Sequence, residues 1–287
     1  MTKRTRSKLP KLHLLVAYPY CTASMVRVIK RLQEVADVEL MLDSGAFTAW
    51  NSGKTIALAD YCNFVRTPPL HFHNVVQLDC IGNVEGTREN YLHMRSEGLR
   101  CIPVFTRGNT REALDEMYED SDYVLLGGIA TGENVKGYVK WFQTLSGKRK
   151  VHWLGFTNRE FLAHYRPFSA DASSWHLASR MGAADVYVGK GVCRKLTWAD
   201  CRHPSAALLP LLHSHGFCGD MVKELGTRQR WRGAGSISLD LAASANVLRA
   251  RDIKARFGTK LYFCVSTPFQ VESLTKMIPR IPAQGKP

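Results

Sequence analysis

Short apolar runs and amphipathic stretches alternate along most of the chain. Apolar runs bounded by turn-forming residues predict strands, which we expect at residues 12–18, 38–42, 74–78, 100–105, 123–126, 151–154, 168–170 and 260–265. Apolar positions spaced three or four residues apart predict helices at residues 22–35, 58–65, 85–97, 110–118, 135–145, 159–165, 174–181 and 238–257. Strands and helices that alternate in this way are typical of βαβ units and a parallel sheet.

The expected fold class is α/β, a TIM-like (β/α)8 barrel with an irregular basic insertion near the C-terminal end. A doubly wound sheet also alternates strands and helices. It gathers reactive residues at one switch point, however, whereas here they follow many different strands. The expected parts are a basic tail, the main βα-barrel portion, a Cys/His/Arg-rich insertion, a barrel-closing helix and strand, and a second tail, at residues 1–11, 12–190, 191–236, 237–275 and 276–287.

Three of the expected strands run into an aspartate, namely Asp43, Asp79 and Asp171. Carboxylates at the C-terminal mouth of a parallel sheet lie where enzymes of this architecture hold their reactive groups. Any one of them is equally well explained as the cap of the next helix. Capping explains all three less well, because neither Ser44-Gly45 nor the segment 80–82 is expected to start a helix. The three aspartates are therefore candidate active-site carboxylates.

Two further features belong to the same edge of the expected sheet. Gly127-Gly128 follows a strand and offers backbone N–H groups that a flat ring could approach, although a simple turn is the alternative. Phe47 and Trp50 follow Asp43 and could stack on a base, and core packing explains them equally well.

The charge balance indicates a polyanionic partner. Lys and Arg number 39 against 25 Asp and Glu, a formal net charge of +14. Solubility alone and a solvated charged face are the alternatives. The segment 228–232 interleaves an aromatic with three Arg, which suits backbone binding with stacking. The candidates for phosphate contact are Lys3, Arg4, Arg6, Lys8, Lys11, Arg107, Lys190, Arg228, Arg230, Trp231 and Arg232.

The eight cysteines are scattered, which favours reduced thiols in a cytoplasmic protein over a disulfide framework. Cys193, Cys201, His203 and Cys218 are weak metal candidates, since they include no compact CxxC pair. We therefore expect no cofactor, with a structural zinc as an alternative that the spacing does not support. No stretch approaches the roughly 20 apolar residues of a membrane span, so no membrane partner is expected.

Five short motifs resemble, in the same order, those of tRNA-guanine transglycosylases. They are DSGAF (43–47), LDCIG (78–82), LLGGIATGE (125–133), LGFTN (154–158) and the aspartate Asp171, and the resemblance covers residues 12–180. The chain is more similar still to the shorter phage and bacterial relatives proposed to act on DNA guanine. The resemblance implies that Asp171 attacks C1′ of the target nucleotide, that Asp43 transfers protons, and that Asp79 binds the base. The resemblance further implies that the backbone of Gly127-Gly128 contacts the base, and the full set of candidate base-binding residues also contains Ser44, Gly45, Phe47, Phe105 and Thr106.

The chemistry of the residues agrees with this resemblance. Breaking a base–sugar bond builds positive charge on the sugar, which a carboxylate stabilises and can trap. The base must also leave the stack, which calls for basic and aromatic side chains.

The chain departs from this family at two places. Val104-Phe105-Thr106-Arg107-Gly108 replaces the segment with the base-binding Gln, so Thr106 or Arg107 would contact a different edge or a modified base. The zinc-binding CxCxxC…His pattern is absent from the sequence, which favours DNA over tRNA.

The expected function is cleavage of a base–sugar bond in DNA through an aspartyl–glycosyl intermediate, with exchange for a free 7-deazaguanine-type base. The DNA would be single-stranded, or a duplex with a flipped base. The first alternative is a DNA glycosylase on the same scaffold, which excises a modified base and leaves an abasic site. The second is a non-catalytic nucleic-acid-binding barrel, which three retained buried carboxylates disfavour.

Overall fold

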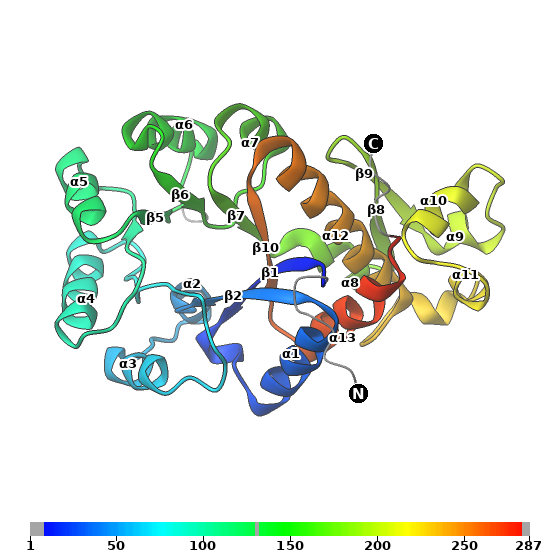
Figure 1. Ribbon diagram of the computed structural model, residues 1–287, viewed down its shortest axis with the longest axis horizontal. Coiled ribbons are helices and arrows are strands. Elements are labelled where there is room, and N and C mark those ends of the chain that lie inside the picture. The colour runs from blue at the N-terminus through cyan, green and yellow to red at the C-terminus, as the bar shows by residue number, and fades with distance from the viewer. Residues whose placement is uncertain (1–8, 130–131, 283–287) are drawn as a thin grey trace.

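Eight parallel strands form one curled sheet in the computed structural model, which describes residues 9–129 and 132–282 (Figure 1). The sheet order is β3-β2-β1-β10-β7-β6-β5-β4. The strands are β1 (Lys11–Ala17), β2 (Asp37–Asp43), β3 (Asn74–Val75), β4 (Val104–Phe105), β5 (Tyr123–Leu126), β6 (Lys150–Trp153), β7 (Ser169–Ala172) and β10 (Lys260–Val265). The expected α/β class is therefore confirmed, and the sheet is compatible with a TIM-like fold.

Helices surround the outer face of this sheet (Figure 1). Those that connect or follow its strands are α1 (Ala23–Val35), α2 (Ala46–Asn51), α3 (Leu58–Arg66), α4 (Val84–Ser96), α5 (Arg111–Asp120), α6 (Val135–Ser146), α7 (Arg159–Tyr165), α8 (Leu177–Arg180), α12 (Ile237–Phe257) and α13 (Pro268–Met277). Several begin at side-chain caps, as α1 does where Thr22 accepts a hydrogen bond from the backbone of Met25. Two helices, α2 and α13, were not predicted from the sequence.

The two end strands of the sheet, β3 and β4, are linked by an isolated bridge between Val76 and Ile102 rather than by a continuous ladder. Both strands are shorter than the sequence predicts. Pro103 has no N–H to donate, and the side chain of Gln77 takes over part of the pairing by accepting a hydrogen bond from the backbone of Val104 at 2.9 Å. The sheet is thus curled without being a closed barrel.

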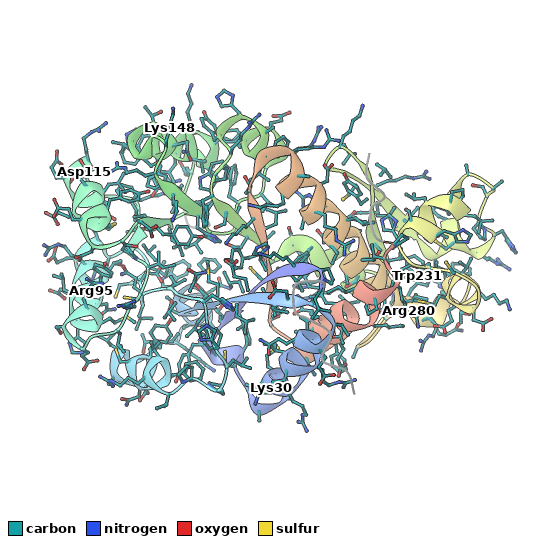
Figure 2. The ribbon with its side chains drawn as sticks, viewed as in Figure 1. Lys30, Arg95, Asp115, Lys148, Trp231 and Arg280 are labelled. Atoms are coloured by element: carbon teal, nitrogen blue, oxygen red, sulfur yellow. The ribbon has the colours of Figure 1, made fainter. Side chains whose placement is uncertain are left out.

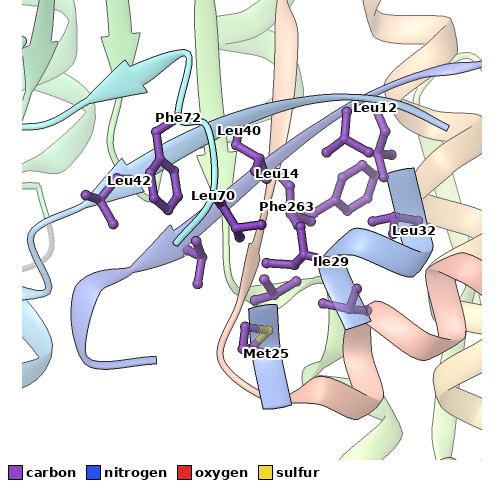
Figure 3. Close-up of a cluster of buried hydrophobic side chains, with 14 of the residues drawn as sticks. Leu12, Leu14, Met25, Ile29, Leu32, Leu40, Leu42, Leu70, Phe72 and Phe263 are labelled. Atoms are coloured by element: carbon purple, nitrogen blue, oxygen red, sulfur yellow. The ribbon is translucent and has the colours of Figure 1, made fainter. Parts of the chain in front are cut away.

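Strand periodicity separates the two faces of the sheet. Alternate residues of β1 and β2, such as Leu14 and Leu40, point outward and pack against Met25, Ile29 and Leu32 of α1 (Figure 3). The residues between them point inward, where Leu15, Met41, Val104, Tyr123, Leu125 and Tyr262 form the core inside the curl. This alternation decides which side chains reach the inside of the curled sheet.

The insertion is regular structure rather than an irregular segment, and its buried residues form one cluster with Ile237 and Leu241 of α12 and Met277 of α13. It consists of the hairpin β8 (Ala183–Gly189) and β9 (Val192–Thr197), the helices α9 (Trp198–Arg202), α10 (Leu208–Ser214) and α11 (Asp220–Leu225), and the short 3-10 helix η4 (Arg228–Trp231). It lies to one side of the sheet (Figure 1). The boundary expected at residue 190 falls in the turn of the hairpin, so the insertion begins earlier in the chain than predicted.

The segment expected as a C-terminal tail begins within regular structure. Helix α13 ends at Met277, and Ile278 and Ile281 are buried against the sheet and α1. Residues 1–8 and 283–287, which hold most of the expected N-terminal tail and the end of the C-terminal one, lie outside the described residues. Among the helices that are described, none is both long and apolar enough to cross a membrane.

Candidate active site

A cavity of about 630 Å³ opens at the C-terminal edge of the sheet, and Asp43, Asp79 and Asp171 all line it. The carboxyl ends of parallel strands meet at one edge, which brings together residues far apart in the chain. The three carboxylates that the sequence singles out therefore line one cavity, and their role as active-site groups stays a prediction.

Strand geometry explains why these side chains point into the cavity. Asp43 is the last residue of β2 and is paired with Ala17, which also lines the cavity. Asp171 lies within β7, one residue before its end, rather than after the strand as predicted. Its position two residues after Ser169 places both side chains on the inner face. Asp79 lies in the loop after β3, where its Oδ1 accepts a hydrogen bond from Ser44 Oγ at 3.3 Å.

Asp171 is surrounded by hydrogen-bond donors. Its Oδ1 accepts from the backbone N–H of Gly155 at 2.8 Å and from Nε2 of His152 at 3.0 Å, and its Oδ2 accepts from the thiol of Cys264 at 2.8 Å. Donors at both oxygens hold the carboxyl group in one orientation at the cavity. This orientation suits an aspartate that acts as a nucleophile.

Asp43 has the opposite environment. Burial, the neighbouring carboxylate of Asp79 and then that of Asp171 raise the pKa of Asp43 to about 7, against a weaker opposing effect of backbone N–H groups. Burial also raises the pKa of Asp79. A group whose pKa lies near neutrality can both give and accept a proton, so Asp43 suits general acid–base chemistry.

The segment after Asp43 departs from the sequence prediction, because Ser44-Gly45 does start a helix. Gly45 has a φ of +80° and caps α2, and its N–H donates to Asp43 Oδ2 at 2.9 Å. A Cβ on Gly45 would lie 2.5 Å from Pro19 Cδ, so both the conformation and the space require glycine. Asp43 therefore orients the turn before α2, but no side chain caps this helix, so capping does not explain Asp43.

The glycine pair forms one wall of the cavity, as expected. A Cβ on Gly127 would lie 2.7 Å from Val104 Cγ1, and Gly128 has a φ of +67°. Thr106, which also lines the cavity, lies beside Gly128. The neighbouring residues 130–131 of the predicted motif lie outside the described residues. The wall next to Gly128 is thus made of backbone and one small hydroxyl side chain.

Arg107 does not line the cavity. Its guanidinium donates to the carbonyl oxygens of Gly128 at 2.8 Å and Glu133 at 2.9 Å, and it lies 4.0 Å above the ring centre of Tyr138. These contacts hold the loop that contains Gly127 and Gly128 on its side away from the cavity. Arg107 therefore packs against the loop that contains Gly127 and Gly128 and does not face a base held in the cavity, while its expected contact with phosphate stays a prediction.

The predicted aromatic residues divide into rim and core. Phe47 is 43% exposed, lines the cavity, and lies with its ring centre 6.0 Å from that of Trp50, which is 53% exposed. Both are therefore accessible for stacking. Phe105, by contrast, is fully buried against Trp141 and Phe142, so its prediction as a base-binding residue is wrong.

The predicted phosphate-contact segment is only partly available. Trp231 lies in the insertion (Figure 2). It is 1% exposed and donates through Nε1 to the carbonyl of Leu225, so it cannot stack on nucleic acid. Arg230 forms an ion pair with Glu224 at 3.1 Å. Lys190, Arg228 and Arg232 are exposed. In the tails, Lys11 starts β1 at the edge opposite the cavity, and Lys3, Arg4, Arg6 and Lys8 lie outside the described residues.

Several cavity residues were not predicted. Arg180, His176 and Leu177 line the cavity from the segment after β7, while Cys264 lines it from β10 and His152 reaches Asp171 from β6. Counting alternate residues along each strand places His152 and Cys264 on the inner face but does not show that they contact Asp171. The segment after β7 offers no comparable signal.

The predicted metal candidates are not brought together. Among the described residues, one group of three metal-capable side chains is close enough to share an ion, Cys62, His93 and Glu97, and it contains none of Cys193, Cys201, His203 or Cys218. Arg66 already pairs with Glu97 at 2.6 Å. All eight cysteines are free thiols.

Comparisons with known proteins leave the family of the chain open. No protein-family model, curated protein or solved structure matches it at a significant level.

Proposed function

We propose that the protein cleaves the bond between base and sugar in DNA through a covalent aspartyl–glycosyl intermediate and exchanges the base. The observation that carries the proposal is the contrast between two carboxylates in one cavity. Asp171 accepts hydrogen bonds from three donors, whereas the pKa of Asp43 is raised to about 7. A carboxyl group held in place by three donors suits a nucleophile, and one whose pKa lies near neutrality suits a proton carrier.

In the proposed reaction Asp171 attacks C1′ of the flipped nucleotide. The C1′–N bond breaks, its electron pair goes to the base, and Asp43 supplies the proton that the departing base needs. A second base then forms its own bond to C1′, releases Asp171 as a carboxylate and returns the proton to Asp43. Binding of the base is assigned to Asp79 with Ser44, Thr106 and the Gly127-Gly128 backbone.

Other features support this proposal without testing it. The order of the eight strands is that of a (β/α)8 barrel, and we assign the fold to that class on this basis. The five motifs occur in the order found in tRNA-guanine transglycosylases, and we assign the chain to the shorter relatives of that family. The net charge of +14 and the exposed Phe47 and Trp50 suit a DNA partner of a cytoplasmic enzyme.

Hydrolytic excision of a modified base is the second candidate. The position of Arg107 favours it. Arg107 is hydrogen-bonded to the carbonyl of Gly128, and Thr106 is the one residue of segment 104–108, which departs from the family, that lines the cavity. Because pocket contacts set the choice of substrate, this difference favours a base other than the one the family binds.

The test is mass spectrometry of nucleosides from DNA treated with the protein, with and without free 7-deazaguanine. Incorporation of the added base supports exchange, and abasic sites formed without it support excision. DNA that is bound but chemically unchanged under both conditions contradicts the proposal and indicates a binding protein.

A further inference from the structure

We propose that the two carboxylate oxygens of Asp171 have different roles, and that His152 is the positioning residue that fixes them. Oδ2 attacks the sugar, while Oδ1 remains hydrogen-bonded to the protein throughout the reaction. This inference rests on the proposed function, because it assigns the atoms of the same attack. It adds two residues, His152 and Cys264, to the determinants of the reaction.

Oδ1 is the oxygen with the stronger donors. It accepts from the backbone of Gly155 at 2.8 Å and from His152 Nε2 at 3.0 Å. His152 is fully buried on β6, so its ring cannot turn to solvent without disrupting the inner face of the sheet. Donors that are fixed before the reaction stabilise charge without reorganisation.

The other contacts of His152 determine which nitrogen carries its proton. A carboxylate only accepts, so Nε2 donates to Asp171. Nδ1 lies 2.6 Å from Ser169 Oγ, which is also hydrogen-bonded to the hydroxyl of Tyr123. In a neutral imidazole Nδ1 accepts from Ser169, and Ser169 accepts from Tyr123. Burial raises the pKa of Tyr123, which keeps its hydroxyl a donor, so the whole row of donors points towards Asp171.

Oδ2 has a weaker and more accessible partner. Among the described residues its donor is the thiol of Cys264 at 2.8 Å, and Cys264 lines the cavity. Burial and the adjacent Asp171 raise the pKa of this thiol well above its usual value, so it stays protonated and donates. A thiol is a weak donor, and it is therefore the contact that an incoming sugar can displace.

The atoms balance in both steps. A lone pair of Oδ2 forms the bond to C1′ while the C1′–N pair leaves with the base and Asp43 protonates it. The resulting ester keeps Oδ1 as its carbonyl oxygen, still held by Gly155 and His152. When the incoming nitrogen or water oxygen bonds to C1′, the C1′–Oδ2 pair returns to the carboxylate and Asp43 takes the released proton. His152 stabilises this returning charge, so it assists mainly the second step.

The experiment follows the covalent adduct over time. Wild type and single variants are mixed with a single-stranded oligonucleotide containing all four bases, with free 7-deazaguanine, and are quenched in acid for denaturing electrophoresis. We expect His152→Leu to slow decay of the adduct about tenfold, the loss expected for one hydrogen bond to a charged group. His152→Gln, whose amide can donate in place of Nε2, should restore most of the rate. Cys264→Ser should form the adduct about tenfold more slowly than Cys264→Ala, because a hydroxyl binds the attacking oxygen more strongly.

His215→Gln is the matched control, because His215 is equally buried but contacts Tyr187 and Leu211 in the insertion. Its adduct should form and decay as in the wild type. Equal decay in His152→Leu and wild type, or equal formation in Cys264→Ser and Cys264→Ala, overturns the inference and leaves Asp171 as nucleophile. If the wild type forms no adduct that depends on Asp171, the proposed function fails and this inference fails with it.

Discussion

Replacing Asp43 by Asn removes one of three carboxylates from the cavity and tests its electrostatics without any assumption about the substrate. Burial and the carboxylates of Asp79 and Asp171 raise the pKa of Asp43 from 3.8 to about 7 in the folded protein. The folded state therefore holds a proton that the unfolded chain has lost, and stability falls as the pH rises from near 3.8 through about 7. Three pKa units at about 1.4 kcal/mol each set an upper bound of about 4 kcal/mol.

Asn cannot ionise, so the variant should not lose this stability. Between pH 5 and pH 8 the free energy of unfolding of Asp43→Asn should rise by about 2 to 3 kcal/mol relative to the wild type. Urea unfolding, followed by the fluorescence of the tryptophans at several pH values, measures this difference, and other titrating groups cancel in it. Asp220→Asn, on the exposed start of α11, is the control and should show no such change. A constant difference between Asp43→Asn and the wild type from pH 5 to pH 8 would refute the argument.

Three further predictions follow from the same geometry. Gly45→Ala should lower the free energy of unfolding by about 1 to 3 kcal/mol in urea titrations, because it forces an L residue to a φ of +80° against Pro19. Gly53→Ala, where φ is also positive but the space is open, should lower the free energy of unfolding less. Trp50→Ala should weaken binding of a single-stranded oligonucleotide about tenfold in fluorescence anisotropy if Trp50 stacks on a base, and unchanged affinity contradicts a stacking role. The rate of adduct formation should fall above about pH 7 as Asp43 loses its proton, and a flat profile from pH 6 to pH 9 removes Asp43 as the acid.

The fold was largely predictable because short apolar runs alternate with amphipathic stretches along the chain. The alternation of side chains along each strand then places the leucines of β1 and β2 outward and Asp43 and Asp171 inward, whereas Asp79 lies in the loop after β3. The lengths of β3 and β4 were not predictable, because Pro103 and the side chain of Gln77 replace part of the regular pairing. Helix α2 was missed because it begins at a left-handed glycine rather than at a side-chain cap.

The candidate site was predictable in its carboxylates but not in their partners. A histidine in an apolar strand is usually a satisfied core residue, and only the pairing of β6 with β7 shows that His152 reaches Asp171. The prediction for Trp231 erred in the other direction. Its place among three Arg suggests a surface position, but its side chain is buried in the hydrophobic cluster of the insertion. The partners of Arg107 were also not predictable, because they are backbone carbonyls that a sequence pattern does not reveal.

The central claim is that Asp171 becomes covalently bound to the sugar. The most direct measurement is the intact mass of the protein after acid quenching of a reaction with a single-stranded oligonucleotide, followed by mapping of the modified peptide. We predict a protein–DNA adduct on the peptide that contains Asp171, and its absence from Asp171→Asn. Base release or exchange by the wild type without such an adduct, or with unchanged rate in Asp171→Asn, would contradict the claim.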